Sequence, residues 1–375
     1  MRFLTTALIL LTMRVTAAPS VPISGVSVNL DVSALLVEGE QLSRFVFYAQ
    51  YAGASYCNTF KYHNASVACG NHVCPNATAD KAYIYSTFHG VETDIRGFVG
   101  IDNVASNIIV SVRGSSSVRN WLTDFRFGKV SCDFFDGCEA HDGFVHALDE
   151  IKASVVLSVT AAAKHHPSHT LVVTGHSLGG AVATLLAAHL RRQGLAADLY
   201  TYGAPRVGTP ALAEFLTAQA HDNGDGGPGA GTGPVAAGRN FRVTHYYDPV
   251  PRMPPLSFGY AHASPEYWLA AGPYSRVAYG VGDVRECLGI LNASCNAGHW
   301  WVSSARAHGF YFETISKCSD ESGGGVIMWA ELEALDRDEE FRRKFAEYGR
   351  ADERYARWTQ GNATDGGFEE ETEPE

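Results

Sequence analysis

A serine lies in the segment VVTGHSLGG, residues 172–180, with Gly175 and Gly179 two positions to either side of Ser177. An apolar run precedes this serine and an Ala- and Leu-rich run follows it, which predicts a sharp turn between a strand and a helix. Small residues are needed at both positions because the two backbones crowd such a turn. The pattern therefore predicts Ser177 as a nucleophile. The backbone N–H of Leu178, which opens the helix, would help to stabilise an oxyanion.

A serine hydroxyl is a weak nucleophile near neutral pH and needs a histidine base that a carboxylate orients. In this setting the chain order is serine, then acid, then histidine. Asp248 follows the run FRVTHYY and precedes a proline, which predicts a loop at the carboxyl edge of a strand. Asp283 is the alternative acid. The candidate bases are His262, His299 and His308. The residues alone favour the last of them only modestly, because it stands closest to the final cysteine.

An amphipathic stretch, SSSVRNWLTDF at residues 115–125, follows an Arg-Gly pair. Written as a helix, it gathers four apolar side chains on one face: Val118, Trp121, Leu122 and Phe125. Most amphipathic helices pack that face on a core. Taken alone, the stretch is therefore interpreted as a short core-packing helix at the end of a strand.

The rest of the sequence predicts a sheet that helices cover on both faces. The expected strands are residues 82–88, 97–102, 107–114, 170–174, 198–202 and 241–247, and the expected helices are 31–52, 143–159, 178–192 and 209–220. Strands that alternate with helices and are apolar throughout are typical of a mostly parallel sheet. The Gly-rich stretch 221–238 predicts an inserted surface loop.

The N-terminal residues resemble a targeting segment. Residues 1–17 combine a basic residue, an apolar run and small residues, which is typical of a cleaved signal peptide. We expect residues 18–30 to form a short propeptide or an N-terminal arm. The sequence contains no later run of about 18 apolar residues, so it does not predict a stable membrane anchor. The sequence therefore indicates a secreted, extracellular protein.

Negative charge gathers at the C-terminal end of the chain. The formal net charge is −11, and residues 319–375 hold 17 acidic and 7 basic residues, a balance of −10. No basic patch stands out elsewhere, which argues against a nucleic acid partner. Helical periodicity over 326–358 and an acidic end predict a C-terminal extension, 321–375, that is part helical and part disordered. Nothing in the sequence identifies a protein partner.

Eight cysteines behind a signal peptide predict disulfides, because the secretory route is oxidising. Three close pairs indicate local loops, and the two remaining cysteines would tie the ends of the domain together: Cys69–Cys74, Cys132–Cys138, Cys287–Cys295 and Cys57–Cys318. A zinc site is disfavoured because the sequence contains no CxxC pair. Four sequons mark candidate glycosylation sites: Asn64, Asn76, Asn292 and Asn362.

Seven segments, in order, resemble the filamentous-fungal secreted triacylglycerol lipases of the class 3 lipase family. They are VRGSSSVRNWLTDF, HDGF, VVTGHSLGGA, YTYGAPRVG, THYYDPVPRMPP, FGYAHASPEYW and AHGFYF. The resemblance implies an α/β-hydrolase fold and a triad of Ser177, Asp248 and His308. It also implies that Ser115 and Leu178 form the oxyanion pair. Chemistry of this kind requires no cofactor and no metal.

The same resemblance gives residues 115–125 a second interpretation, as a short helical lid that covers the site in water and opens at a lipid surface. Its apolar side chains would be buried in both states, each worth about 1.5–3 kcal/mol. A lipid surface that prefers the open form would then shift the population. The lipase domain would span residues 31–320.

Together these observations predict a secreted serine hydrolase that cleaves acylglycerol esters at a lipid–water interface through an acyl-enzyme intermediate. Triacylglycerols are the expected substrate. A feruloyl esterase and a mono- or diacylglycerol lipase on the same scaffold are the alternatives, and a non-catalytic lipid-surface binder is disfavoured by the intact candidate triad. The extension has no counterpart in compact family members. It could serve as a propeptide, a cover over the site, a docking module or a solubilising tail.

Overall fold

The computed structural model describes residues 37–70, 73–115, 127–220, 237–270, 272–291, 294–299, 303–318 and 324–362, with the backbone alone at 324–329 and 356–362. Several predicted features lie outside these residues. They are the signal peptide 1–17, the arm 18–30, the lid side chains Val118, Trp121, Leu122 and Phe125, most of the Gly-rich insertion, and the acidic end.

The described residues form an eight-stranded sheet in the order β1-β2-β3-β6-β7-β8-β9-β10. Pairing is parallel from β3 to β9 and antiparallel for β1–β2, β2–β3 and β9–β10. The strands are β1 (Tyr83–His89), β2 (Arg96–Asp102), β3 (Asn107–Val112), β6 (Thr170–His176), β7 (Ala197–Tyr202), β8 (Asn240–His245), β9 (Glu266–Leu269) and β10 (Val284–Cys287). A separate ribbon pairs β4 (Lys129–Ser131) with β5 (Glu139–His141). The carboxyl ends of β6 and β8 therefore meet at one edge of the sheet.

The strands form because their apolar runs are buried on both faces. Every residue of β3 is buried, with Ile109 in the core on one face and Val110 in the core on the other. This two-sided burial is expected for a parallel sheet between helices. Each of the six predicted strands is present to within two residues at either end, and the mostly parallel α/β architecture is confirmed.

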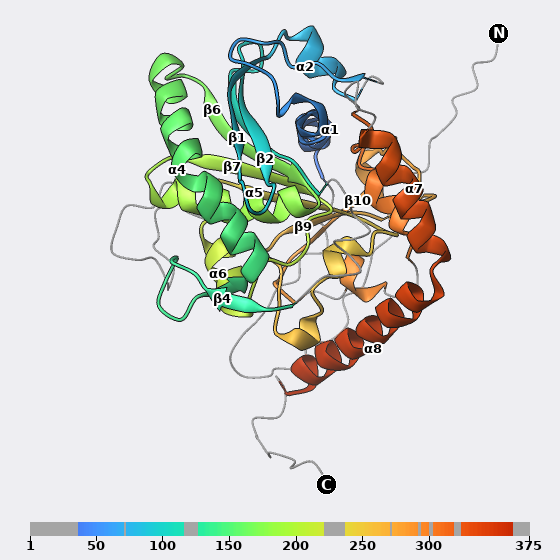
Figure 1. The fold of residues 1–375 in the computed structure, drawn as a ribbon. Coiled ribbons are helices and arrows are strands. Elements are labelled where there is room, and N and C mark those ends of the chain that lie inside the picture. The colour runs from blue at the N-terminus through green and yellow to red at the C-terminus, as the bar shows by residue number, and fades with distance from the viewer. Residues whose placement is uncertain are drawn as a thin grey trace, which may run out of the picture. The chain divides into compact units, whose positions relative to one another are not determined.

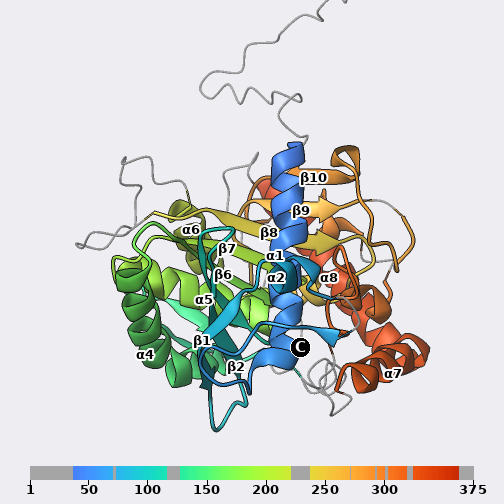
Figure 2. The ribbon, with the colours of Figure 1, turned by 90° about the horizontal axis from the view of Figure 1, so that it is seen from above.

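Helices cover both faces of the sheet (Figure 1, Figure 2). One core joins the strands to α4 (Asp142–His165), α5 (Leu178–Arg192) and α6 (Pro210–Ala218), while the opposite core joins them to α1 (Gly39–Asn58) and α2 (Pro75–Ala79). Helix α1 begins at Gly39, so the described residues Val37 and Glu38 of the predicted helix are not helical, and it continues six residues beyond its predicted end. Its last turns consist largely of small, buried residues, so the helix can press closely on the sheet.

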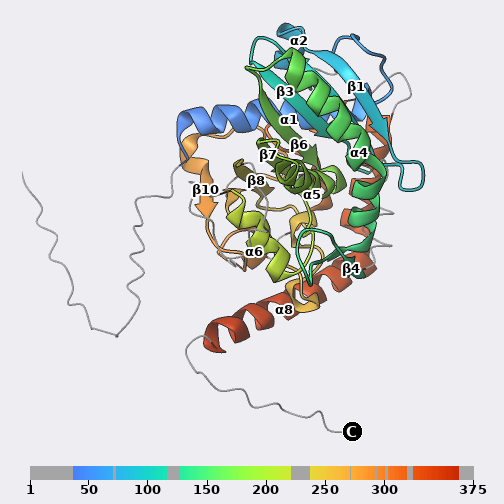
Figure 3. The same cartoon turned by 90° about the vertical axis from the view of Figure 1, so that its left-hand side faces the viewer.

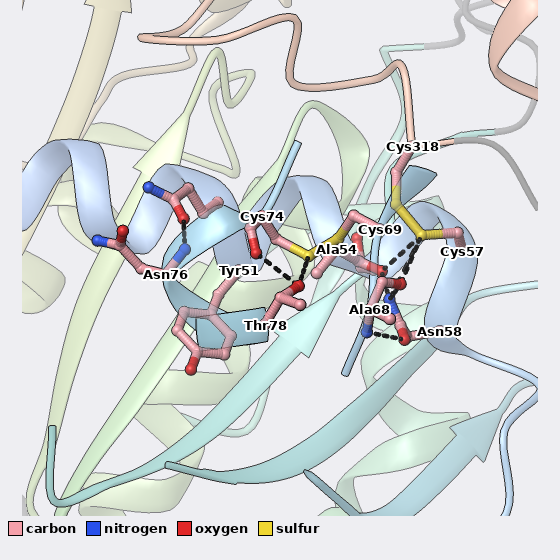
Figure 4. The surroundings of a disulfide bond; sticks show 12 residues. Tyr51, Ala54, Cys57, Asn58, Ala68, Cys69, Cys74, Asn76, Thr78 and Cys318 are labelled. Atoms are coloured by element: carbon pink, nitrogen blue, oxygen red, sulfur yellow. Dashed lines mark hydrogen bonds between the residues drawn. A yellow bond between two sulfur atoms is a disulfide. The ribbon is translucent and has the colours of Figure 1, made fainter. Parts of the chain in front are cut away.

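Four disulfides join the same cysteine pairs that the sequence suggested. The Cys57–Cys318 bond connects α1 with a residue 261 positions further along the chain. Figure 4 shows the Cys69–Cys74 bond beside it, and the sulfur atoms of Cys57, Cys69 and Cys318 lie within 4.8 Å of one another. Because all three sulfurs are in disulfides, none is a thiolate that could bind a metal ion.

Between β8 and Cys318, the described residues outside β9 and β10 form loops and short 3-10 helices: η3 (Val250–Arg252), η4 (Leu256–Phe258), η5 (Val281–Asp283), η6 (Asn296–Gly298) and η7 (Ala305–Gly309). Two longer helices follow the last cysteine, α7 (Gly324–Arg337) and α8 (Glu339–Asn362). Asp338 separates them, since its carboxylate accepts from the Phe341 N–H at 3.0 Å and caps the start of α8. Figure 3 shows α8 on the side of the domain away from α1.

Candidate active site

Ser177 occupies the turn between β6 and α5, with φ 58° and ψ −133°. This left-handed backbone is strained for a residue with a side chain and costs about 1–3 kcal/mol. The turn is possible only with glycines beside it. A Cβ on Gly179 would run into the carbonyl of Val112 on the neighbouring strand, and a Cβ on Gly175 would run into Gly179. The backbone thus presents the serine as a nucleophile elbow does.

Asp248 lies in the loop that follows β8 and is fully buried. Its Oδ1 accepts from the Val250 N–H at 2.9 Å, which fixes the carboxylate in the loop. Its Oδ2 accepts from Nδ1 of His308 at 2.8 Å and from the Tyr311 hydroxyl at 2.5 Å. Burial and the nearby Asp248 raise the pKa of Tyr311 well above its usual value, so this phenol remains a donor.

His308 lies in η7, fully buried, with its ring held by Asp248 through Nδ1. Gly203 lies against this pair, because a Cβ there would stand 2.8 Å from Oδ2 of Asp248 and 3.0 Å from Nδ1 of His308. Ser177 reaches the same place, since its N–H donates to the carbonyl of Tyr202, the residue before Gly203, at 2.9 Å. Nucleophile, base and acid candidates therefore converge.

Ser177 Oγ and His308 Nε2 are both buried, and neither has a hydrogen-bond partner among the described residues. The other side-chain polar atoms of Asp248 and His308, namely Oδ1, Oδ2 and Nδ1, are all engaged in hydrogen bonds. A catalytic hydrogen bond is often loose before substrate binds and tightens in the reacting complex. The two unpartnered atoms are thus the ones that proton transfer would use.

A second histidine supports the His308 loop. His176, the residue before the nucleophile, has Nε2 2.7 Å from the carbonyl oxygen of His308 and Nδ1 2.7 Å from the Tyr56 hydroxyl. A carbonyl only accepts, so Nε2 carries the proton and Nδ1 accepts from Tyr56. Burial lowers the pKa of His176 well below its usual value and keeps the ring neutral. Tyr56 of α1 is thereby linked to the loop of His308 through the imidazole of His176.

Both predicted oxyanion residues belong to segments that adjoin the candidate nucleophile. Leu178 opens α5 directly after Ser177. Ser115 follows Gly114, and Gly114 is so close to Ser177 that a Cβ there would stand 3.2 Å from the serine Cβ. The N-terminus of a helix favours negative charge, so this corner suits an oxyanion.

The alternative acid and bases make other contacts. Asp283 in η5 pairs with Arg276 at 2.5 Å. Nε2 of His262 contacts the carbonyl of Pro251 at 2.7 Å. Nδ1 of His299 contacts the carbonyl of Cys295 at 2.7 Å, and its ring packs on Trp268. The structure brings His308, and neither of the other two histidines, into hydrogen-bond contact with Asp248.

Three supporting residues were not predicted: Tyr56, His176 and Tyr311. His176 and Tyr311 stand inside the segments GHSLG and AHGFYF, so their proximity to the motifs was a usable signal. Tyr56 is 120 residues from His176, and no local pattern reveals that contact. Of the sequons, Asn64 is exposed in a turn and Asn76 is exposed on α2, Asn362 is the last residue of α8, and Asn292 lies outside the described residues.

The sheet order, the strained serine turn and the buried histidine–aspartate pair define an α/β hydrolase. The family model for Lipase (class 3) matches residues 109–258. A Fusarium solani protein named "Secreted mono- and diacylglycerol lipase 1" is 40% identical over 343 residues, which cover 91% of this chain and 95% of that protein. This chain therefore belongs to the class 3 lipase family and is a carboxylic ester hydrolase.

Solved structures agree with this assignment. The mono- and diacylglycerol lipase from Aspergillus oryzae superimposes with a TM-score of 0.67 at 34% identity, covering 74% of this chain and 99% of that one. A structure described as "A serine protease triad forms the catalytic centre of a triacylglycerol lipase" has a TM-score of 0.60 at 29% identity, covering 74% and 96%. Each of the two superpositions thus leaves about a quarter of this chain uncovered. No helix in the described part of this chain has the length and apolar character to cross a membrane.

Proposed function

We propose that Ser177, His308 and Asp248 are the nucleophile, base and acid of this hydrolase. One observation carries the proposal: Asp248 engages Nδ1 of His308, which leaves Nε2 as the basic atom beside the strained serine turn. A carboxylate in this position holds the imidazole in the required tautomer and stabilises the imidazolium that forms.

The reaction proceeds in two halves. Nε2 of His308 takes the hydroxyl proton as Oγ of Ser177 attacks the ester carbonyl carbon, and the carbonyl oxygen becomes an oxyanion beside Leu178 and Ser115. When the tetrahedral centre collapses, the alcohol oxygen leaves with the proton from His308, and the acyl group stays on the serine. Water then gives a proton to His308 and attacks the acyl-enzyme, which releases the fatty acid and restores Ser177.

Mono- and diacylglycerols are the substrates that we propose. The support is that this chain is 40% identical to a protein named as a mono- and diacylglycerol lipase over nearly its full length. Triacylglycerols, the substrate that the sequence predicted, are the second candidate, because a structure at 29% identity is described as a triacylglycerol lipase. A feruloyl esterase has no such support among these relatives.

Secretion and a lid also belong to the proposal. Relatives of this chain are named as secreted lipases, which supports the signal peptide predicted at residues 1–17 and an extracellular location. The lid predicted at residues 115–125 would make the rate depend on a lipid surface. Phe127, the first described residue after this segment, packs against Tyr348 of α8, and the centroids of the two rings are 5.5 Å apart.

The test measures fatty-acid release from dioctanoylglycerol and trioctanoylglycerol as each concentration crosses its solubility limit, with ethyl ferulate as a third substrate. We expect faster fatty-acid release from dioctanoylglycerol than from trioctanoylglycerol, and a jump in rate once droplets form. We expect no release of ferulate from ethyl ferulate. We expect Ser177→Ala to lower kcat by about 10³- to 10⁶-fold. Ser43→Ala is the matched control, because that serine is exposed on α1.

Each result decides a different part of the proposal. Full activity of Ser177→Ala would overturn the assignment of the nucleophile. Faster release from trioctanoylglycerol would restore the triacylglycerol prediction. Smooth saturation without a jump would remove the lid and leave the serine esterase intact.

A further inference from the structure

The 3-10 helix that carries His308 has no side-chain cap of its own. η7 begins after Ser304, whose side chain caps none of the helix N–H groups. The first N–H groups of a helix have no partner within it and need an acceptor from elsewhere. The loop that places the base therefore depends on a group supplied by another part of the chain.

Asp336, on α7 of the C-terminal extension, supplies that group. Its carboxylate accepts from the Ala305 N–H at 2.5 Å, from the Ser304 hydroxyl at 2.7 Å and from Nε of Arg306 at 2.8 Å. These donors are three consecutive residues that end two positions before His308. One carboxylate thus fixes the backbone and two side chains at the entry to η7, and hydrogen bonds to a charged acceptor are the strong ones.

The apolar side of α7 contacts the other supports of the site. Leu332 and Leu335 are fully buried and form one cluster with Val250 and Ala305, on which Tyr56 also packs. Val250 holds Oδ1 of Asp248 through its N–H. A single packing cluster therefore joins α7 to the loop of Asp248, to the loop of His308 and to Tyr56.

Helix α8 fastens this arrangement to the domain. Nη1 of Arg206, which is 1% exposed, donates to Oδ2 of Asp352 at 3.1 Å and to the carbonyls of Arg252 and Pro254. Oδ1 of Asp352 accepts from the Ser257 N–H at 3.2 Å. The buried pair joins α8 to the segment that follows Asp248, so the extension is attached at the acid side as well as at the base side.

We propose that the C-terminal extension positions the catalytic base, with Asp336 as the positioning residue for His308. This inference rests on the proposed function of His308. Without the carboxylate, the buried Ala305 N–H loses its acceptor and η7 can move relative to Ser177. Displacement of a catalytic group by about 1 Å can cost about 100-fold in rate. A solubilising tail would have no such effect, and a cover over the site would have the opposite one.

The test uses the full chain with Asp336→Ala, Asp336→Asn and the control Asp338→Asn. Asp338 is two residues away, and its Oδ1 accepts from the Phe341 N–H at the start of α8. We measure kcat and KM on p-nitrophenyl butyrate, a soluble ester, and the rate and final amount of labelling by a fluorophosphonate. The final amount of labelling measures how many molecules are folded with a reactive serine. The rate of labelling measures how well the base activates that serine.

We expect Asp336→Ala to lower kcat and the labelling rate together, by about 10- to 100-fold, with KM within about twofold and the final amount of labelling unchanged. Asp336→Asn keeps an acceptor for the Ala305 N–H but loses the charge facing Arg306, so it should fall between Asp336→Ala and the unaltered chain. Asp338→Asn should behave as the unaltered chain does. If Asp336→Ala yields no folded protein, Asp336→Asn decides the question by the same measurements.

The inference is overturned if both Asp336 variants label and turn over at the unaltered rate. It is equally overturned if their losses match a smaller amount of labelled protein, because the effect is then one of folding alone, or if kcat rises, because the extension is then a cover. Activity in Ser177→Ala would instead reject the proposed function, so the two failures are distinguishable.

Discussion

At the scale of single residues, the groups that support the candidate catalytic side chains are held by specific hydrogen bonds. Oδ2 of Asp248 receives two donors, His308 and Tyr311, while Oδ1 receives the Val250 N–H. A buried carboxylate needs such partners because an unpaired charge in the interior is costly. The tyrosine hydroxyl thus gives this buried carboxylate a second donor beside the candidate base.

We expect Tyr311→Phe to lower kcat by about 10- to 100-fold while KM stays within about twofold. A hydrogen bond to a charged group is worth about 1.5–3 kcal/mol, and each 1.4 kcal/mol of lost transition-state stabilisation is tenfold in rate. The measurement is steady-state kinetics on a soluble butyrate ester. Tyr279→Phe is the control for loss of a neighbouring phenol, because the Tyr279 hydroxyl donates to the carbonyl of Arg276, three residues earlier in its own loop. An unchanged kcat in Tyr311→Phe would contradict this role.

Motif spacing pointed to the candidate nucleophile and acid, but it did not single out the candidate base or the residues that support the site. Ser177 follows from its glycines, and Asp248 from its place after an apolar run. The residues alone left His308 among three histidines, and only the ordered resemblance selected it. Contacts such as Tyr56 with His176 depend on how α1 crosses the sheet, which no stretch of sequence encodes by itself.

At the scale of elements, Glu150 attaches α4 to the turn between β1 and β2. Its carboxylate accepts from the Thr93 hydroxyl and from the backbone N–H groups of Glu92 and Thr93, at 2.8 and 2.9 Å. The hydroxyl above all, then the backbone donors, lowers the pKa of Glu150 from 4.5 to about 2. The ionised carboxylate is therefore the form that stabilises this junction.

We expect Glu150→Gln to lower the free energy of unfolding at pH 6. The folded-state pKa lies below the unfolded one, so the contribution is complete above about pH 4.5 and is lost as the pH falls towards about 2. Urea unfolding at pH 6, 4 and 2.5 should show the two chains converging. Glu214→Gln, exposed on α6, should match the unaltered chain throughout. A difference independent of pH would disprove the assignment.

Long apolar strands were predictable because two-sided burial demands a continuous apolar run. The four-residue strands β9 and β10 were not predicted, since EYWL and VREC are too short and too polar to stand out. Glu266, the polar residue that begins β9, pairs with Arg242 of β8 at 3.3 Å. The periodic stretch 326–358 was predicted as helical, and Asp338 divides it into two helices.

At the scale of the whole molecule, the Cys57–Cys318 bond joins α1 to the segment that leads into the extension. A disulfide stabilises mainly by restricting the unfolded chain, and the effect grows with the loop that it closes. This bond closes a separation of 261 residues, whereas Cys132–Cys138 closes one of 6. The two bonds should therefore contribute differently to stability.

We expect the double substitution of Cys57 and Cys318 by alanine to lower the free energy of unfolding by about 5 kcal/mol, against about 2 kcal/mol for Cys132 and Cys138. Replacing both partners of each bond leaves no unpaired thiol. Urea unfolding of the two variants beside the unaltered chain provides the measurement. Equal losses in the two variants would show that loop length does not determine the effect.

The same bond can form only after most of the chain has been synthesised. Chains are made at about 5–20 residues per second, so Cys57 emerges roughly 13–50 s before a partner that lies 261 residues later. Cys69 and Cys74 emerge within that interval, and Cys69 ends up beside Cys57 in the folded domain. A temporary pairing among these early cysteines must be undone by thiol–disulfide exchange before the ends of the domain can be joined. Wherever such a pairing forms, the exchange capacity of the folding compartment decides how much of that chain reaches the native state.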